Sequence, residues 1–125
     1  MAKKKNRRKE ILIVEDEPQM LKVLDRKISS LGHSTTLAEN GEVALKKIQN
    51  KEFDLILLDI ILPGKSGFDI LEAMKAEGIE TPVIVISNLG SEDDVEMAIR
   101  LGAKDYFIKS NITLRELVSK IDSPE

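Results

Sequence analysis

The chain has 125 residues, of which 42% are hydrophobic and 33% are charged, as is typical of one soluble globular domain. It contains no cysteine, which excludes disulfide bonds, thiolate metal sites and a cysteine nucleophile. No apolar run reaches the roughly 20 residues of a membrane-spanning helix, and no stretch near Met1 is typical of a signal peptide, so we expect a cytoplasmic protein without membrane contact.

The chain opens on a basic segment, residues 1–9, which contains six of the 19 lysine and arginine residues. The other 13 are outnumbered by 22 acidic residues, so the rest of the chain is strongly acidic. This predicts no direct nucleic-acid binding, because nucleic-acid-binding domains carry positive charge on a folded face. We interpret residues 1–9 as a flexible leader; contact with a phosphate backbone or an anionic membrane is the alternative.

Short apolar runs alternate with amphipathic stretches along the rest of the chain. Runs of this length without polar interruption are typical of strands buried on both faces of a parallel sheet. Five strands are predicted, the second of them weakly: Ile11–Val14, His33–Ala38, Asp54–Leu58, Pro82–Ile86 and Asp105–Ile108. Apolar residues three or four positions apart predict five helices, with stripes over Met20–Leu31, Val43–Ile48, Phe68–Met74, Val95–Ile99 and Leu114–Ile121.

Capping and turn residues support these helix boundaries. Asn40 is suited to cap the second helix, and Ser91 followed by Asp94 is close to a capping box for the fourth. Glycines lie where three helices should end, at Gly32, Gly78 and Gly102. Repeated strand–helix units predict an α/β fold with a five-stranded parallel sheet, right-handed crossovers and helices on both faces.

Polar or ionisable side chains directly follow four of the five predicted strands. The first strand leads into Glu15-Asp16-Glu17, the third into Asp59, the fourth into Ser87 and the fifth into Lys109. In an open α/β sheet, ligands bind beyond the carboxyl ends of the strands, where the strand order reverses. We therefore expect these residues to converge on one site.

Asp59 is the centre of this predicted site. A carboxylate directly after Leu55–Leu58 is poorly hydrated and needs a partner, although an isolated aspartate here would ordinarily be a capping or loop residue. Glu15 and Asp16 at an adjacent strand end change this interpretation, because three carboxylates repel one another unless a cation lies among them. Oxygen ligands without histidine or cysteine select Mg²⁺ or Mn²⁺. With the lysine and the hydroxyl at the other strand ends, the set favours a site for a phosphoryl group.

The sequence resembles the receiver domain of two-component response regulators in four segments: ILIVEDEP, DLILLDIILPGKSG, PVIVIS and GAKDYFIK. The resemblance runs from Glu10 to about Ile121, and it is specific because acidic pair, aspartate, hydroxyl and lysine come in that order, each at a strand end. It implies a doubly wound, flavodoxin-like (βα)5 receiver fold with strand order 2-1-3-4-5. The receiver domain is expected over residues 10–122, with a short tail at 123–125 and no effector domain.

The resemblance also implies the roles of the acidic residues. Asp59 would accept a phosphoryl group from a sensor histidine kinase or a histidine phosphotransfer protein. Glu15 and Asp16 would hold Mg²⁺, assisted by Asp59 and by the backbone carbonyl of Ile61. The chain would then be a phosphorylation-dependent switch, catalysing only its own phosphorylation and dephosphorylation.

Three further residues receive roles from the same resemblance. Lys109 would pair with Asp59 and then with the phosphoryl oxygens, and Ser87 would hydrogen-bond the phosphoryl group. Tyr106 would swing from exposed to buried, although an ordinary half-buried strand aromatic is an equally good interpretation. Lys109 departs from the family pattern, because Ser110 follows it where receivers usually have a cis proline. A cis bond before a non-proline residue costs about 3–4 kcal/mol, so we expect a trans bond or strain here.

Three residues near the expected phosphorylation site also depart from the family pattern. Asn88 follows Ser87, where a smaller residue is common, and it should narrow access to Asp59. Ile61 and Leu89 lie two residues beyond Asp59 and Ser87, where receivers that lose their phosphate quickly tend to carry polar groups. An apolar pair cannot orient an attacking water, so we predict a long-lived phosphoryl state.

Two other functions stay open at this point. A small-molecule Mg²⁺-dependent phosphohydrolase would use Asp59 as its nucleophile, but it usually needs a cap domain or a general acid two residues later, which Ile61 cannot provide. A flavin- or nucleotide-binding module would need a glycine-rich phosphate loop after the first strand, where the chain has acidic residues instead.

The output of the predicted switch depends on other proteins. By resemblance, the face of the fourth helix, fifth strand and fifth helix would bind a downstream partner, and the chain would be a monomer or a phosphorylation-linked homodimer. It would be either a stand-alone receiver or a piece of a longer regulator. His33, the only histidine, is interpreted as a surface or packing residue rather than a phosphorelay residue.

Overall fold

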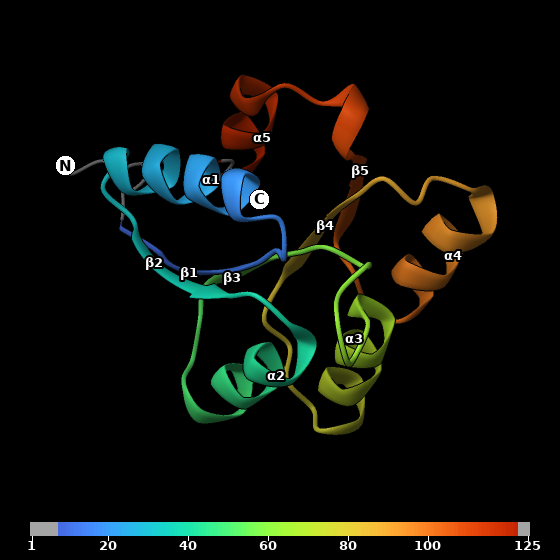
Figure 1. The fold of residues 1–125 in the computed structure, drawn as a ribbon. Helices are drawn as coiled ribbons and strands as arrows, with labels where there is room; N and C mark the ends of the chain where they lie inside the picture. The colour runs from blue at the N-terminus through green and yellow to red at the C-terminus, as the bar shows by residue number, and fades with distance from the viewer. Residues whose placement is uncertain (1–7, 123–125) are drawn as a thin grey trace, which may run out of the picture.

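The computed structural model describes residues 8–122, and five strands alternate along them with five α-helices (Figure 1). The elements are β1 (Glu10–Val14), α1 (Pro18–Ser30), β2 (Ser34–Ala38), α2 (Gly41–Asn50), β3 (Leu55–Leu58), α3 (Gly67–Ala76), β4 (Val83–Ser87), α4 (Glu92–Arg100), β5 (Asp105–Ile108), the 3₁₀ turn η1 (Lys109–Asn111) and α5 (Leu114–Ile121). Every predicted strand is confirmed, with ends that differ by at most one residue.

The five strands form one parallel sheet in the order β2-β1-β3-β4-β5, as expected. Helices α1 and α5 cover one face of this sheet, and α2, α3 and α4 cover the other (Figure 1). The chain leaves β1 toward β2 and then returns to place β3 on the other side of β1. The strand order therefore reverses between β1 and β3, which is where such sheets bind ligands.

The apolar runs are continuous because both faces of the sheet are covered. In β1, Leu12 and Val14 pack with the core under α2, α3 and α4, whereas Ile11 and Ile13 pack with the core under α1 and α5. All four side chains are at most 1% exposed. Successive strand residues point to opposite faces, so a doubly covered strand has no position for a polar residue until it ends.

The predicted helix signals are also confirmed. Asn40 accepts a hydrogen bond from the backbone N–H of Val43, and Ser91 accepts one from the backbone N–H of Asp94. The three glycines expected at helix ends all have positive φ: Gly32 (98°), Gly78 (72°) and Gly102 (111°). None of the helices in residues 8–122 is long and apolar enough to cross a membrane.

His33 has the packing role that was expected of it, at the edge of the sheet where the strands begin. It is 8% exposed, its Nδ1 accepts the backbone N–H of Lys9, and its Nε2 lies 3.0 Å from Asp122 Oδ1. Lys9, assigned to the leader on sequence grounds, also donates through Nζ to the backbone carbonyl of Ile121. The rest of the predicted leader, residues 1–7, and the predicted tail, residues 123–125, lie outside the described residues.

Candidate functional site

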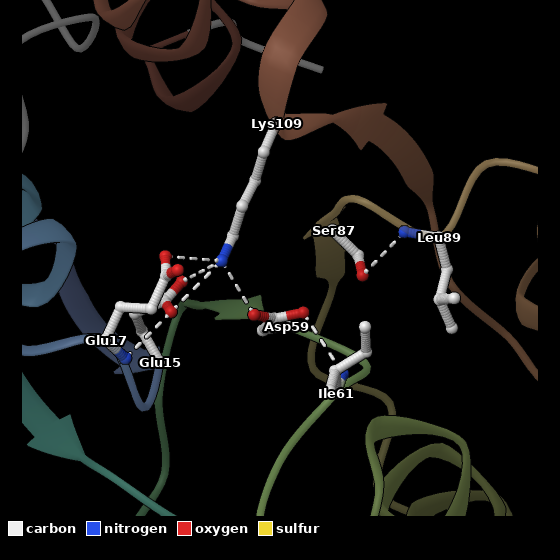
Figure 2. A network of polar contacts seen from close by, with 7 residues as sticks. All are labelled: Glu15, Glu17, Asp59, Ile61, Ser87, Leu89 and Lys109. Atoms are coloured by element: carbon white, nitrogen blue, oxygen red, sulfur yellow. Dashed lines mark hydrogen bonds and ion pairs between the residues drawn. The ribbon is translucent and has the colours of Figure 1, made fainter.

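The polar residues that follow the strands come together at one edge of the sheet, as predicted (Figure 2). Glu15 follows β1, Asp59 follows β3, Ser87 ends β4 and Lys109 follows β5. Glu15, Asp59 and Ser87 are buried, with exposed fractions of 2%, 4% and 0%. Buried polar groups need partners, and those partners define the chemistry of the site.

The backbone of the two buried carboxylate residues is held by the neighbouring strands. The N–H of Asp59 donates to the carbonyl of Val14, and the N–H of Glu15 donates to the carbonyl of Ala38. Both residues therefore continue the ladder by one bond beyond the assigned strands. Their side chains are placed by the sheet itself rather than by a loop, which makes their separation rigid.

Lys109 is the cation at the centre of the site. Its Nζ lies 2.8 Å from Asp59 Oδ2, 3.0 and 3.1 Å from the two oxygens of Glu15, and 3.1 Å from Glu17 Oε1. An ammonium group has three donors, and here three carboxylates share them. The Lys109 side chain is 10% exposed, so these are largely desolvated, charge-assisted contacts.

The ionisation of Lys109 and Glu15 reflects this environment. Burial alone lowers the pKa of Lys109, but hydrogen bonds to Asp59 and Glu15 outweigh it, and the pKa lies above its ordinary value. Burial raises the pKa of Glu15, and the like charge of Asp59 adds to this, while hydrogen bonds from the Glu17 backbone and from Lys109 oppose it. The site therefore holds a stable ammonium beside carboxylates that compete for positive charge.

Two of these carboxylates, with that of Asp16, form a cluster that fits a hard divalent cation. Glu15, Asp16 and Asp59 each offer one oxygen, and these oxygens lie within 4.8 Å of one another. Asp16 is exposed, so a cation can reach the cluster from solvent. With Glu17, four carboxylates lie at these strand ends and three of them contact the Lys109 ammonium, and this excess of negative charge suits an oxygen-liganded Mg²⁺-type ion.

The loop after β3 folds back on Asp59. The backbone N–H of Ile61 donates to Asp59 Oδ1 over 3.1 Å, and the N–H of Gly67 donates to the carbonyl of Ile60. A Cβ atom at Gly67 would lie 2.6 Å from the backbone oxygen of Asp59, so only glycine allows this approach. One carboxylate oxygen of Asp59 thus faces the loop and the other faces Lys109 (Figure 2).

Ser87 and Tyr106 lie beside this centre. Ser87 Oγ accepts the backbone N–H of Leu89 over 3.3 Å. The hydroxyl of Tyr106 donates to the carbonyl of Leu89, which places the half-buried ring in an inward position. Burial, together with the charge of Asp94, raises the pKa of the Tyr106 hydroxyl. The two residues are thus joined through one short segment of backbone.

The peptide bond between Lys109 and Ser110 is trans, since residues 8–122 contain no cis bond. This is one of the two outcomes expected from the missing proline. Lys109 begins the 3₁₀ turn η1, directly after β5. The trans form therefore still delivers the Lys109 ammonium to Asp59.

Glu17 is the site residue to which sequence reasoning gave no role. In the sequence it is the third acidic residue after the first strand. Its contact with Lys109 depends on where η1 places that lysine, and no sequence pattern reports this. The available signal was the length of the acidic run, because a third carboxylate at a crowded strand end also needs a counter-charge.

Comparison with known proteins agrees with this geometry. Residues 11–122 match the family model of the response regulator receiver domain. The chain is 42% identical over 101 residues to Regulator of RpoS from Escherichia coli K12, covering 81% of this chain and 30% of that protein. It is 36% identical over 121 residues to the probable transcriptional regulator ycf27 of Cyanidium caldarium, covering 97% and 48%. The chain thus spans no more than about half the length of these curated relatives.

Solved structures of response regulators superpose on this chain. The receiver domain of the Francisella response regulator 1452 superposes with a TM-score of 0.86 at 27% identity, covering 91% of this chain and 93% of that one. The response regulator TrrA of Thermotoga maritima, in complex with Mg(2+)-BeF, has a TM-score of 0.79 at 31% identity, covering 90% and 96%.

The family match includes the acidic cluster, the serine and the lysine, and it covers nearly the whole chain. This match sets aside the phosphohydrolase and the flavin- or nucleotide-binding module as alternatives. The chain belongs to the response regulator receiver domain family, whose members are phosphorylation-dependent signalling switches rather than enzymes in their own right.

Proposed function

We propose that Asp59 is the residue that accepts the phosphoryl group in this receiver. The observation that carries the proposal is the position of this one carboxylate. It is 4% exposed, one oxygen is 2.8 Å from the Lys109 ammonium, and it belongs to the cation cluster with Glu15 and Asp16. A nucleophile for phosphoryl transfer needs this combination of fixed position and nearby positive charge.

In the proposed reaction, an Asp59 oxygen forms a bond to phosphorus while the bond from phosphorus to the donor nitrogen breaks. The departing imidazole of the phosphohistidine keeps the electron pair of that bond. Lys109 neutralises charge on the phosphoryl oxygens, and the Ser87 hydroxyl donates to one of them. A Mg²⁺ ion held by Glu15, Asp16, Asp59 and the Ile61 carbonyl would supply further positive charge to those oxygens.

The donor in this proposal is a sensor histidine kinase or a histidine phosphotransfer protein, acting on a receiver in the cytoplasm. Receiver domains partner with histidine kinases as a family. After phosphorylation, the inward position of Tyr106 would be stabilised through the segment that joins it to Ser87. A new dianionic group that repositions one hydroxyl is enough to bias such a loop.

The output surface we propose is the face made by α4, β5 and α5. Two large apolar residues on α4, Met97 and Ile99, are 42% and 47% exposed. A hollow of about 280 Å³ lies between β5 and α5, and Tyr106 lines it. Exposed apolar groups beside the proposed switch are suited to a protein partner or to a second phosphorylated copy. In this proposal the chain itself does not bind nucleic acid.

The proposal is tested by incubating the purified protein with acetyl phosphate and Mg²⁺ and measuring its intact mass. We expect the wild type to gain one phosphoryl group, only with Mg²⁺, and Asp59→Asn to gain none. Asp54→Asn is the matched control, because Asp54 lies at the other end of β3 and Asn can still accept the N–H of Glu10. An adduct that persists in Asp59→Asn, or that forms equally without Mg²⁺, would contradict the proposal.

A further inference from the structure

Lys109 is held by three carboxylates, and one of them differs from the other two. Asp59 and Glu15 are buried, and both belong to the cluster that fits a divalent cation. Glu17 contacts Lys109 over 3.1 Å, but its side chain is 62% exposed and it is not one of the clustered residues. The three contacts therefore respond differently when a cation enters the site.

A divalent cation and Lys109 draw on two of the same carboxylates, those of Glu15 and Asp59. The cluster places oxygens of Glu15 and Asp59 together, and these are the residues that also accept hydrogen bonds from Lys109. A bound cation would weaken both of these contacts and would repel the ammonium. The contact with Glu17 is the one that uses no oxygen of the cluster.

Hydrogen bonds hold the backbone of Glu17 in place, so its side chain starts from a fixed position near Lys109. Its N–H donates to Glu15 Oε2, and its carbonyl accepts the N–H of Leu21. Glu17 is the N-cap residue of α1, and Pro18 fixes the first position of that helix. Within residues 8–122, the polar contact recorded for the Glu17 side chain is the one with Lys109.

We propose that Glu17 is a positioning residue that keeps the Lys109 ammonium beside Asp59 when a divalent cation occupies the acidic cluster. The inference rests on the proposed function of that cluster. Without Glu17, Lys109 would keep its place in the cation-free protein, where Glu15 and Asp59 hold it. On cation binding it would be released, and the phosphoryl group would lose its lysine.

The test follows the Lys109 ammonium directly by lysine-selective ¹H–¹⁵N NMR at low temperature, where only ammonium groups held in ion pairs give sharp signals. The Lys109→Met variant assigns the signal. Spectra are recorded for the full chain with and without Mg²⁺. In the wild type, we expect the signal to persist in both states. In Glu17→Ala, we expect it without Mg²⁺ and expect it to disappear when Mg²⁺ is added.

Two further variants separate position from charge. Glu39→Ala removes an exposed carboxylate that follows β2 at the same edge of the sheet, and it should behave as the wild type. Glu17→Gln keeps an acceptor oxygen without the charge, and it should retain more of the signal with Mg²⁺ than Glu17→Ala. Phosphorylation by acetyl phosphate at saturating Mg²⁺ should be slower in Glu17→Ala, by at most about fivefold, the upper end of what one exposed ion pair contributes.

The possible results discriminate among the proposals. Changes in the backbone amide shifts of Asp16 and Asp59 on adding Mg²⁺ report Mg²⁺ binding. If these shifts do not change, both the proposed function and this inference are overturned. If Mg²⁺ binds but the Lys109 signal of Glu17→Ala persists in its presence, the inference alone fails. Loss of the signal in the Mg²⁺-bound wild type would have the same meaning. If Glu17→Ala does not fold, as judged from its amide spectrum, the comparison of wild type with Glu17→Gln decides.

Discussion

The two edges of the sheet both bury polar side chains, but they balance charge in different ways. At the edge where the strands begin, the buried His33 is matched by the backbone N–H of Lys9 and by Asp122. At the edge where the strands end, the buried Glu15 and Asp59 depend on Lys109. At the first edge, called the balanced edge below, hydrogen bonds satisfy the buried polar groups. The second, called the charged edge, keeps an excess of negative charge that only a cation can offset.

This difference shows which feature identifies a functional site in such a fold. Burial of polar groups is common to both edges and serves folding at the first one. The excess of negative charge lies at the second edge, and in the proposed function it persists there because the site receives a cation and a phosphoryl group in turn. Substitutions that alter one edge at a time therefore separate folding from function.

The largest effect is expected from removing the ammonium that contacts the buried Glu15 and Asp59. Lys109→Met leaves Glu15 and Asp59 buried without their partner, and breaking a buried ion pair from one side typically costs about 3 kcal/mol or more. Urea denaturation at neutral pH measures this loss of unfolding free energy. The double variant Lys109→Met/Asp59→Asn should recover part of it. Equal stability of Lys109→Met and the wild type would show that the charged edge needs no counter-charge.

A smaller loss is expected at the balanced edge. His33→Ala removes a side chain that is 3% exposed and leaves the backbone N–H of Lys9 without its acceptor. The cost of such an unsatisfied buried group is about 2 kcal/mol, again measured by urea denaturation. Phosphorylation of Asp59 should keep its wild-type rate, because the two edges lie at opposite ends of the strands. A slower rate in the folded variant would contradict this separation of roles.

The fold was largely predictable from the sequence, because doubly buried strands leave no position for polar residues. For that reason the strand ends, and with them Glu15, Asp59 and Ser87, could be placed to within one residue. Contacts made by flexible side chains were not predictable. The ion pair between Glu17 and Lys109 depends on a turn whose geometry has no sequence period.

The side-chain contacts of His33 and Tyr106 were not predictable either. The contacts of His33 join residues 9, 33 and 122, which no local pattern relates to one another. The inward position of Tyr106 depends on a side-chain rotamer and on one carbonyl, that of Leu89. Sequence patterns predict which face a residue occupies, and they do not predict which of two rotamers it adopts.

Mg²⁺ should stabilise the charged edge and leave the balanced edge unaffected. At a Mg²⁺ concentration tenfold above the dissociation constant, the unfolding free energy of the wild type should rise by about 1.4 kcal/mol. Asp16→Asn should lose most of this gain, because it removes one of the three clustered carboxylates. His33→Ala should keep all of the gain. Thermal or urea denaturation with MgCl₂, and with NaCl of equal ionic strength as the control, measures it.

The pH dependence of this gain has a definite sign. Burial raises the pKa of Glu15, so the folded chain holds that proton at pH values where the unfolded chain has lost it. Without Mg²⁺, the contribution of Glu15 to stability is therefore present at low pH and is lost as pH rises through the interval between its ordinary and its raised pKa. With Mg²⁺, protons compete with the cation, so the Mg²⁺-dependent gain shrinks as pH falls. Glu15→Gln should remove the first trend and weaken the second, because Asp16 and Asp59 still exchange protons for the cation.

The smallest expected effect concerns how long the charged edge keeps its phosphoryl group. Ile61 lies directly beside Asp59, and its side chain is 53% exposed (Figure 2). An apolar side chain there cannot orient a water molecule toward phosphorus, so the phosphorylated state should persist. Ile61→Asn supplies a polar group at the same place and should shorten the half-life severalfold, measured as loss of the phosphoryl mass after the donor is removed.

Val23→Asn is the matched control for this change, because Val23 is 48% exposed on α1 and lies outside the group of residues that contact Asp59. Its half-life should equal that of the wild type. Rapid loss of phosphate from the wild type, unaffected by Ile61→Asn, would show that water reaches phosphorus without help from this position. The lifetime of the phosphorylated state would then depend on the charges around Asp59 alone. The difference in charge between the two edges would in that case account for how long the phosphoryl group stays as well as for its transfer.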